Sequence, residues 1–423
     1  MTLLKTSVLS FIATAVKMLA ALVINKAVAV LVGPSGLALM GQLQNFIQIA
    51  MTAGQGGINQ GVVKHTAEYS VENKTTSALF STATVISFFT AVSAGIIVCV
   101  FSGQLADYFL KNRDYTYIFI LFGFSIIFFV LNQLLLSIIN GLKEIKVFIS
   151  INIVQSVFSL IFTLTMIYWL GLEGVFIAMV TNQSIILLVL IWAIRHHALI
   201  KLSAFRKGFD KIEAKKLLKF SAMTLTSAAV APISHLIVRD YLGNNLSWQE
   251  AGYWQAIWYI SSMYLMVVTT TLGIYYLPKL AELTSKKEIK IELINGYKII
   301  LPIVILMAVL IYLLRDLIIQ ILFSKEFIPM AELFKWQLIG DVIKLASWLL
   351  SYVMLAKAMT KLFITTEIVF SVSFVFLTKY LVSQYGLNGV TYAYALNYSV
   401  YFIVVAFITL NYLRNKNSTL MFK

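Results

Sequence analysis

The motif Gly171-Leu172-Glu173-Gly174-Val175 returns 215 residues further on as Gly386-Leu387-Asn388-Gly389-Val390. Other matches share this offset or one shorter by a residue: Asn182 and Ser184 with Asn397 and Ser399, Leu3-Leu4-Lys5 with Leu217-Leu218-Lys219, and Ala67-Glu68 with Ala281-Glu282. Scattered chance matches would not share an offset, so the sequence predicts two related halves.

The composition predicts a membrane protein. Of the 423 residues, 60% are hydrophobic and 12% are charged, and the mean hydropathy is +0.87. A soluble fold of this size needs more polar surface than that. The first apolar run, 8–32, is longer than a signal-peptide core and contains Lys17 and Lys26, so we expect it to be retained as a span. The single cysteine, Cys99, excludes an intramolecular disulfide.

Apolar runs of about 20 residues, the length that crosses a bilayer, predict twelve transmembrane helices. They are 8–32, 37–61, 79–102, 117–139, 147–170 and 175–194, then 222–241, 251–275, 296–314, 333–355, 362–382 and 390–411. We therefore expect two six-helix bundles, 1–205 and 206–423, joined by a basic linker at about 195–220. Six is an even number of spans, so the repeats should be parallel and related by an axis along the membrane normal.

The distribution of Lys and Arg predicts the orientation. The net charge is +15, and most cations fall in loops of one parity, above all in the linker. The loops of the other parity hold few: Lys111, Arg113, Arg239, Arg315 and Lys325. Such a bias places the basic loops and both termini in the cytoplasm. It also accounts for the charge without a nucleic-acid partner.

Polar residues inside the first two spans are candidates for a substrate site, because charge within a membrane is costly. Lys17 lies near the middle of the first span, and Lys26 lies on the opposite face, where it could equally reach the interface. One narrow face of the second span carries an amide stripe, consisting of Gln44, Gln48, Gln55 and Asn59. Such a stripe either lines a pathway or joins helices by hydrogen bonds.

The seventh and tenth spans carry the other candidates. His235 and Arg239 share a face of the seventh span, where His235 could carry a proton or be an ordinary buried histidine. One face of the tenth span presents Gln337, Asp341, Lys344 and Trp348. Asp341 and Lys344 either pair with each other or border a transport route, with Asp341 titrating and Lys344 binding an anion. We find no phosphate loop, metal-ligand cluster or nucleophile motif, so the chain reads as a transporter rather than an enzyme.

Four short motifs stand beside or within the predicted spans: Gly33-Pro34-x-Gly36-Leu37, Leu277-Pro278-x-Leu280, Leu314-Arg315-Asp316 and Trp336-Gln337-Leu338-x-Gly340-Asp341-x-x-Lys344. They resemble segments of the Wzx-type polysaccharide flippases of the multidrug, oligosaccharidyl-lipid and polysaccharide exporter superfamily. The resemblance covers essentially the whole chain, and it is strongest to the branch that handles O-antigen and enterobacterial common antigen (lipid III).

The resemblance implies a V-shaped all-α transporter in the bacterial inner membrane that alternates between inward-open and outward-open states. Its substrate would be an undecaprenyl-pyrophosphate-linked oligosaccharide, moved from the cytoplasmic to the periplasmic leaflet for lipopolysaccharide or other surface polysaccharide biosynthesis. It implies no cofactor, leaves a proton or sodium gradient open as the energy source, and suggests a polysaccharide polymerase and a chain-length regulator as protein partners. The first-span lysines and the tenth-span face would be its cavity residues.

Three other functions remain open at this point. A cation-coupled multidrug exporter of the same superfamily would need buried carboxylates in the first or seventh span, where this chain has Lys17, Lys26, His235 and Arg239. A peptidoglycan-precursor flippase also carries a polyprenyl pyrophosphate, so charge does not separate it. A scaffold for polysaccharide enzymes would leave the polar stripes unexplained.

Overall fold

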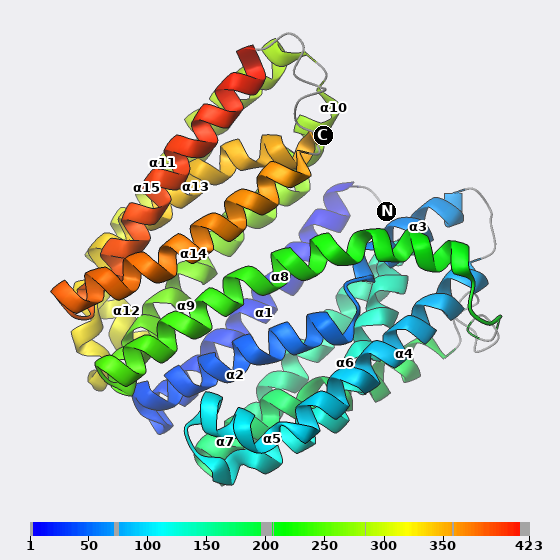
Figure 1. Cartoon of the computed structure of the whole chain (residues 1–423), viewed down its shortest axis with the longest axis horizontal. Coiled ribbons are helices and arrows are strands. Elements are labelled where there is room, and N and C mark those ends of the chain that lie inside the picture. The colour runs from blue at the N-terminus through cyan, green and yellow to red at the C-terminus, as the bar shows by residue number, and fades with distance from the viewer. Residues whose placement is uncertain are drawn as a thin grey trace. The chain divides into compact units, whose positions relative to one another are not determined.

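The computed structural model describes residues 3–71, 76–195, 205, 207–283, 285–357 and 359–414, and these residues are helical nearly throughout (Figure 1). The long helices are α1 (Leu3–Leu31), α2 (Gly33–Gly54), α3 (Asn59–Val71), α4 (Ser77–Val100), α6 (Thr116–Gly141), α7 (Ile145–Ile194), α8 (Lys211–Asn245), α9 (Trp248–Thr271), α11 (Lys286–Leu313), α13 (Phe334–Ala356), α14 (Thr360–Tyr385) and α15 (Asn388–Arg414). Short helices connect them, namely α5 (Ser102–Leu105), η1 (Ala106–Leu110), η2 (Arg113–Tyr115), η4 (Leu272–Tyr276), α10 (Leu277–Glu282), α12 (Arg315–Leu322) and η5 (Lys325–Leu333).

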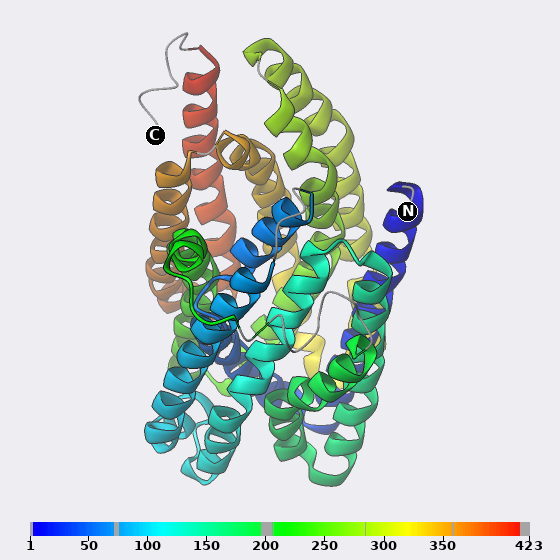
Figure 2. The ribbon, with the colours of Figure 1, turned by 90° about the vertical axis from the view of Figure 1, so that its right-hand side faces the viewer.

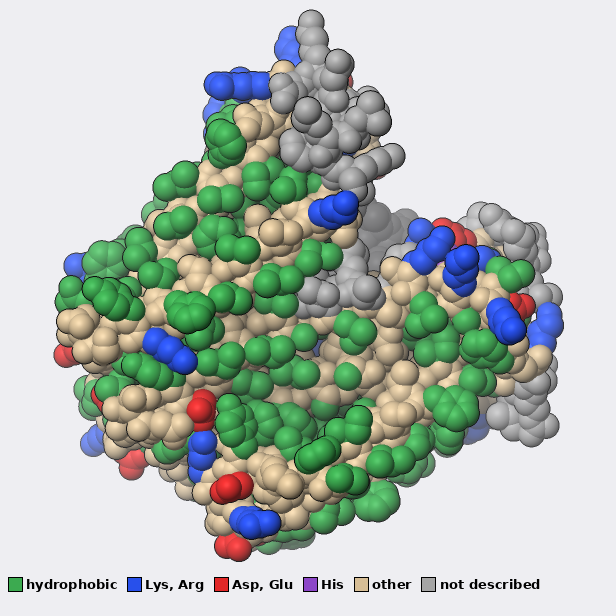
Figure 3. Space-filling view, viewed as in Figure 1, with side chains coloured by type: hydrophobic (Ala, Val, Ile, Leu, Met, Phe, Trp, Pro, Cys, Tyr) green, Lys and Arg blue, Asp and Glu red, His purple; other side chains and the backbone are tan. Residues whose placement is uncertain are grey.

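Each predicted span except 37–61 lies largely within one long helix, and the predicted all-α class is confirmed. The span 37–61 is divided between α2 and α3. The 50 residues of α7 contain two of the predicted spans, 147–170 and 175–194. Gly171 has a non-helical backbone and separates them. Within the described ranges, eight helical segments are long and apolar enough to cross a membrane. Hydrophobic side chains cover much of the face seen in Figure 3. An apolar outer surface of this kind is what lipid requires as a solvent.

The duplicated motif forms the same turn in both halves. Gly171 has φ 56° and Gly386 has φ 58°, a left-handed conformation that favours glycine. A Cβ on Gly174 would overlap the carbonyl oxygen of Met166, and one on Gly389 would overlap that of Leu381. The motif therefore repeats because each half needs one glycine to reverse the chain and a second to let the next helix approach closely.

The described helices group into two compact units. The first comprises Met1–Val32 and Leu39–Ile233, and the second comprises Gly33–Ala38 and Ser234–Lys423. Helix α8 belongs to the first unit up to Ile233 and to the second from Ser234. These units are defined by contacts between residues, whereas the boundary between 205 and 206 is predicted from the sequence repeat. The repeat boundary therefore stays a prediction.

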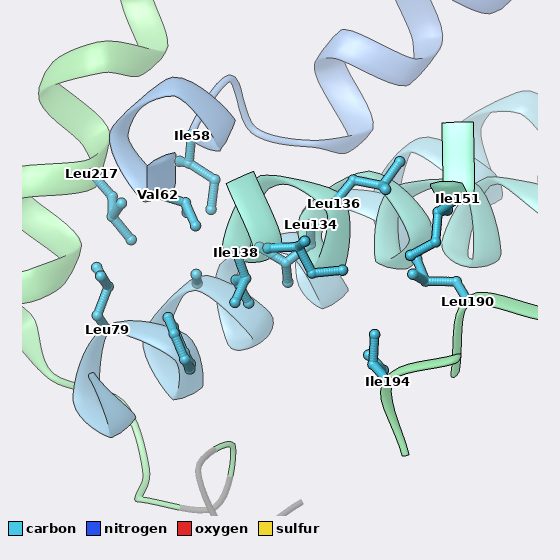
Figure 4. Close-up of a cluster of buried hydrophobic side chains, with 13 residues drawn as sticks. Ile58, Val62, Leu79, Leu134, Leu136, Ile138, Ile151, Leu190, Ile194 and Leu217 are labelled. Carbon is cyan, nitrogen blue, oxygen red and sulfur yellow. The ribbon is translucent and has the colours of Figure 1, made fainter. Parts of the chain in front are cut away.

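Each unit has its own packed helices. In the first, a hydrophobic cluster joins α3, α4, α6, α7 and the start of α8 (Figure 4), and it includes Ile58, Val62, Leu79, Leu134 and Leu217. In the second, α15 packs along α13 and α14, and α14 and α15 lie side by side in both ribbon views (Figure 1, Figure 2). The first core includes α3, which carries Asn59, and the second includes α13, which carries Gln337, Asp341, Lys344 and Trp348.

Candidate functional site

The first unit contains a polar cavity of about 610 Å³ whose walls come from α1, α2, α3, α6, α7 and α8. Carboxamides and hydroxyls dominate its lining: Thr52, Gln55, Asn59, Gln60, Gln133, Ser137, Asn140, Asn152, Gln155, Ser156, Ser159, Asn182, Gln183 and Thr224. Lys17 is the one ionisable side chain among the lining residues of this described region, and no carboxylate is among them. The cavity thus offers many hydrogen-bond donors and acceptors and a single positive charge.

A break between α2 and α3 shapes one wall of this cavity. The sequence predicts a continuous second span over 37–61, but α2 ends at Gly54 and α3 begins at Asn59. The cause is Gly56 and Gly57, which have φ 61° and 65°. A Cβ on Gly57 would lie 2.9 Å from the carbonyl oxygen of Ser221 in α8, so only glycine allows the two segments to pack this closely.

The break places two predicted residues on the cavity wall and leaves two outside it. Gln55 and Asn59 line the cavity, and Asn59 Nδ2 donates to Gln55 Oε1 at 2.9 Å. Gln44 and Gln48 are exposed on α2 and are not among the lining residues. The predicted stripe is therefore divided at the cavity edge.

The opposite walls come from α6 and the two parts of α7, whose amides bond to one another. Gln133 Nε2 donates to Gln183 Oε1 at 3.3 Å, and Asn182 Nδ2 donates to Ser159 Oγ. Asn182 Oδ1 is buried and accepts no hydrogen bond within the described part of the chain, and the same holds for Asn59 Oδ1. Buried acceptors of this kind favour water or a polar ligand in the cavity.

The two first-span lysines differ in position. Lys17 is exposed and lines the cavity, whereas Lys26 is half-buried and does not line it. Both lie on α1, nine residues apart, so they point in different directions. Lys17 alone of the two can meet a ligand in this cavity.

The second unit buries Asp341 in the middle of α13. Its side chain is fully buried and accepts hydrogen bonds from Ser261 Oγ at 2.7 Å, Tyr264 Oη at 2.8 Å and Tyr394 Oη at 2.8 Å. Gln337, one turn earlier, is also buried, and its Nε2 lies 3.5 Å from Asp341 Oδ1. Three hydroxyl donors from α9 and α15 offset much of the cost of burying a carboxyl group.

Lys344 lies one turn beyond Asp341 but is surrounded by aromatic rings. Its Nζ lies 4.8 Å from the ring centroid of Trp258, 5.0 Å from Trp348, 5.6 Å from Tyr394 and 5.1 Å from Tyr398. Ring faces attract a cation, most strongly where water is excluded. Among the salt bridges of the described residues, none within 4.0 Å joins Asp341 and Lys344. Tyr394 contacts both, through its hydroxyl and its ring.

The seventh-span candidates belong to the same buried region. The Arg239 side chain is 1% exposed, donates through Nη2 to Gln255 Oε1 and lies over the Trp254 ring at 5.5 Å. The His235 ring meets the edge of Trp258, with centroids 4.1 Å apart. Arg239 is thus buried in the unit rather than at an interface. The structure brings His235, Arg239, Asp341, Lys344, Gln337 and Trp348 into one cluster in the second unit.

Sequence reasoning missed part of each site. Gln133, Asn140, Asn182 and Gln183 line the cavity, but in the sequence they form no stripe along one helix face. Their only signal is an amide within a membrane span, and it becomes informative only once the fold brings α6 and α7 together around the cavity. Tyr264 and Tyr394 give no signal as carboxylate partners, because tyrosine is also an ordinary interfacial residue.

Comparisons with known proteins agree with this architecture. The model of the family described as "Polysaccharide biosynthesis protein" matches residues 3–284. The lipid III flippase of Escherichia coli (strain K12) is 28% identical over 403 residues, which is 95% of this chain and 97% of that protein. The lipid III flippase of Shigella flexneri matches equally.

Solved transporter structures share the fold. An inward-facing multidrug resistance MATE family transporter of the MOP superfamily superposes with a TM-score of 0.74 at 14% identity, covering 95% of this chain and 96% of that one. The lipid II flippase MurJ, in an inward closed conformation, gives 0.73 at 15% identity, covering 96% and 87%. The proteins that match are flippases and transporters, not enzymes. Since the family model spans most of the sequence and the helices have this fold, the chain is a multi-pass membrane protein that belongs to the polysaccharide biosynthesis protein family.

Proposed function

We propose that this protein is a flippase that moves an undecaprenyl-pyrophosphate-linked oligosaccharide from the cytoplasmic to the periplasmic leaflet of the bacterial inner membrane by alternating access. The oligosaccharide would be an O-antigen unit or lipid III of enterobacterial common antigen. The observation that carries the proposal is the amide-lined cavity of the first unit, in which Lys17 is the only charged residue among the described lining residues.

The wall chemistry suits a sugar. Hydroxyl and acetamido groups each donate and accept hydrogen bonds, and carboxamide side chains do the same. Asn59 and Asn182 hold buried oxygens that accept no bond from the described residues, so a sugar donor would satisfy them. A ligand without hydrogen-bond donors would leave these buried oxygens without a partner, so it would bind more weakly than a sugar. The cavity therefore supports selection of a hydroxyl-rich head group.

The charge of the cavity suits the pyrophosphate. A lysine ammonium is a compact charge that binds phosphate oxygens. A cationic drug would instead meet Lys17 with no carboxylate on the same wall. Charge thus favours the lipid-linked sugar over a multidrug substrate. A peptidoglycan-precursor flippase shares the pyrophosphate, and it is distinguished by experiment rather than by charge.

The buried residues of the second unit are proposed for proton coupling and for a later contact with substrate. Asp341 and His235 remain hypotheses for proton coupling, because both are ionisable groups within the membrane part of the second unit. Lys344 is 7% exposed and ringed by aromatic side chains, so it would meet a pyrophosphate only after these rings move apart. We expect Gln337, Trp348 and Arg239 of the same cluster to contact substrate in that opened state.

Complementation tests the function and the cavity together. The gene is expressed in three bacterial strains, each lacking one flippase: for lipid III, for an O-antigen unit or for the peptidoglycan precursor. We expect rescue in the first or second strain, loss of rescue by Lys17→Ala, and partial retention by Lys17→Arg at equal protein level.

The matched control is Lys64→Ala, which removes an exposed cation from α3 outside the cavity. It should rescue as well as the wild type. Rescue of the peptidoglycan strain alone would assign the other lipid substrate. Full rescue by Lys17→Ala would remove Lys17 from the mechanism.

A further inference from the structure

A second cavity, an apolar groove of about 410 Å³, lies between α11 and α13 in the second unit. Ile305, Ala308, Val309 and Tyr312 of α11 face Lys335, Leu338, Ile339, Val342 and Ile343 of α13 across it. On α13 these positions lie on the side of the helix opposite Asp341 and Lys344. The groove is thus separate from the polar cluster described above.

The groove has a closed floor and open walls. Ala308 and Leu338 form the floor and are 7% and 4% exposed. The walls are open, since Ile305, Val309 and Ile339 are 44%, 48% and 38% exposed. The small Ala308 side chain leaves the space between the two helices. Apolar walls exposed on a membrane helix have the chemistry of a binding site for a hydrocarbon chain.

One end of the groove carries positive charge. Tyr312 in the last turn of α11 and Lys335 in the first turn of α13 both line it, and Lys335 is exposed. Arg315 joins this end, with its guanidinium 4.6 Å from the Tyr312 ring centroid. The one carboxylate recorded near Arg315 within the described residues is exposed Asp316, at 4.0 Å. Two cations at the polar end complement a phosphate.

The length of the groove indicates whether it suits the acyl chain of a phospholipid or the longer chain of a polyisoprenoid phosphate. Ile305 and Tyr312 are seven residues apart on α11, or about 10 Å at the helical rise of 1.5 Å per residue. One leaflet of the hydrocarbon core is about 15 Å thick. The groove therefore fits a single acyl chain that stays within its leaflet, and it is short for a long polyisoprenoid.

We propose that this groove binds an anionic phospholipid, with one acyl chain between α11 and α13 and the phosphate beside Lys335 and Arg315. The site goes beyond the flippase function and needs no substrate in the first-unit cavity. The bound phosphate would hold the segment that joins α11 to α13, formed by α12 and η5, close to the membrane surface.

Native mass spectrometry of the purified full-length protein tests the site, with phosphatidylglycerol and phosphatidylethanolamine of identical chains as probes. The wild type should retain phosphatidylglycerol preferentially. Lys335→Ala should reduce that preference about fivefold, since one lysine near a membrane surface contributes about 1 kcal/mol to binding an anionic lipid. The control is Lys379→Ala, which removes an exposed lysine beside Tyr241 outside the groove.

A second variant tests the acyl-chain part. Ala308→Leu fills the floor and should reduce retention of both phospholipids, whereas Leu306→Phe, on an exposed α11 position outside the groove, should not. Thermal unfolding in detergent confirms that each variant is folded. Equal retention by Lys335→Ala and Lys379→Ala would overturn the proposal. Displacement of phosphatidylglycerol by equimolar undecaprenyl phosphate would also overturn it, and would assign the groove to the polyisoprenoid.

Discussion

In the second unit, the contacts of individual side chains surround two buried ionisable residues, Asp341 and Lys344. Asp341 accepts three hydroxyl hydrogen bonds, and Lys344 lies among four aromatic rings, although the two residues are one turn apart on α13. Tyr394 serves both, because its hydroxyl bonds Asp341 while its ring lies 5.6 Å from Lys344 Nζ. Hydroxyl donors therefore contact Asp341 and aromatic rings contact Lys344, and among the salt bridges of the described residues none within 4.0 Å joins the two.

Removal of the Tyr394 hydroxyl should destabilise the second unit. Tyr394→Phe leaves the ring against Lys344 but removes the 2.8 Å donor of buried Asp341 Oδ1, which keeps only the long contact with Gln337 Nε2 at 3.5 Å among the described residues. Loss of a partner for a buried polar group costs about 1 to 3 kcal/mol, so thermal unfolding in detergent should shift down. Tyr398→Phe is the control, since Tyr398 contributes its ring to the cage. A shift as large for Tyr398→Phe would argue against the Asp341 contact.

A polar triad where α3 meets α8 should make stability depend on pH. Lys216 Nζ donates to Glu213 Oε1 at 2.8 Å and to Tyr69 Oη at 2.6 Å, and Tyr69 Oη donates to Glu213 at 2.7 Å. The hydrogen bond to Glu213, then that to Tyr69, raises the pKa of Lys216 above its ordinary value of 10.5. Burial, followed by the contact with Glu213, raises the pKa of Tyr69 above 10.0, although its bond from Lys216 acts the other way.

Both shifts have the same sign for stability. Each group binds its proton more tightly in the folded state, so the stabilisation is complete below the ordinary pKa and is lost as pH rises through the folded one. Unfolding temperatures should therefore be constant between pH 7 and 9 and fall above pH 10. Lys216→Met with Tyr69→Phe should flatten that fall. An unchanged slope in the double variant would exclude the triad as its cause.

At the scale of elements, pairs of glycines decide where helices break. Gly56 and Gly57 end the second span early and turn Gln55 and Asn59 to the cavity, and Gly171 and Gly386 reverse the chain between helices. The apolar runs are long enough to locate the helices from sequence alone. The break at Gly56 was not predicted, because two adjacent glycines within an apolar run can also continue a helix.

The α2–α3 break gives a graded prediction. Both Gly56→Ala and Gly57→Ala place a side chain at positive φ, which costs about 1 to 2 kcal/mol. A Cβ at residue 56 makes ordinary contacts from 3.4 Å, whereas one at residue 57 would lie 2.9 Å from Ser221 O. Gly57→Ala should therefore lower the unfolding temperature further and also reduce transport. Equal effects of the two variants would show that backbone strain alone matters there.

At the scale of the whole molecule, the cavity lining can be compared with the residues that the sequence predicted. Lys17, Gln55 and Asn59 were predictable because charge or an amide stripe within a span is unusual. The amides of α6 and of α7 beyond Gly171 were not, since their meeting depends on which helix faces pack together. Gln44, Gln48 and Lys26 share the same sequence signal but do not line the cavity, because helix rotation and the α2 break turn them away.

The duplication also bears on the whole molecule. The matched glycine turns recur in both units, yet the first unit holds an open amide cavity and the second a buried cluster of ions and aromatic rings. The two units thus share the glycine turns but differ in their polar chemistry. We therefore expect the sugar head group to bind in the first unit.

Transport in reconstituted vesicles tests that claim most directly. Purified protein is placed in liposomes with an undecaprenyl-pyrophosphate-linked oligosaccharide, and the rate at which the sugar becomes accessible to an external lectin is measured. We predict that Lys17→Ala and Gln155→Leu each slow this rate about tenfold or more, the effect of losing about 1.4 kcal/mol of binding, while Lys64→Ala matches the wild type. Wild-type rates for both cavity variants would contradict the assignment of the first-unit cavity as the substrate site.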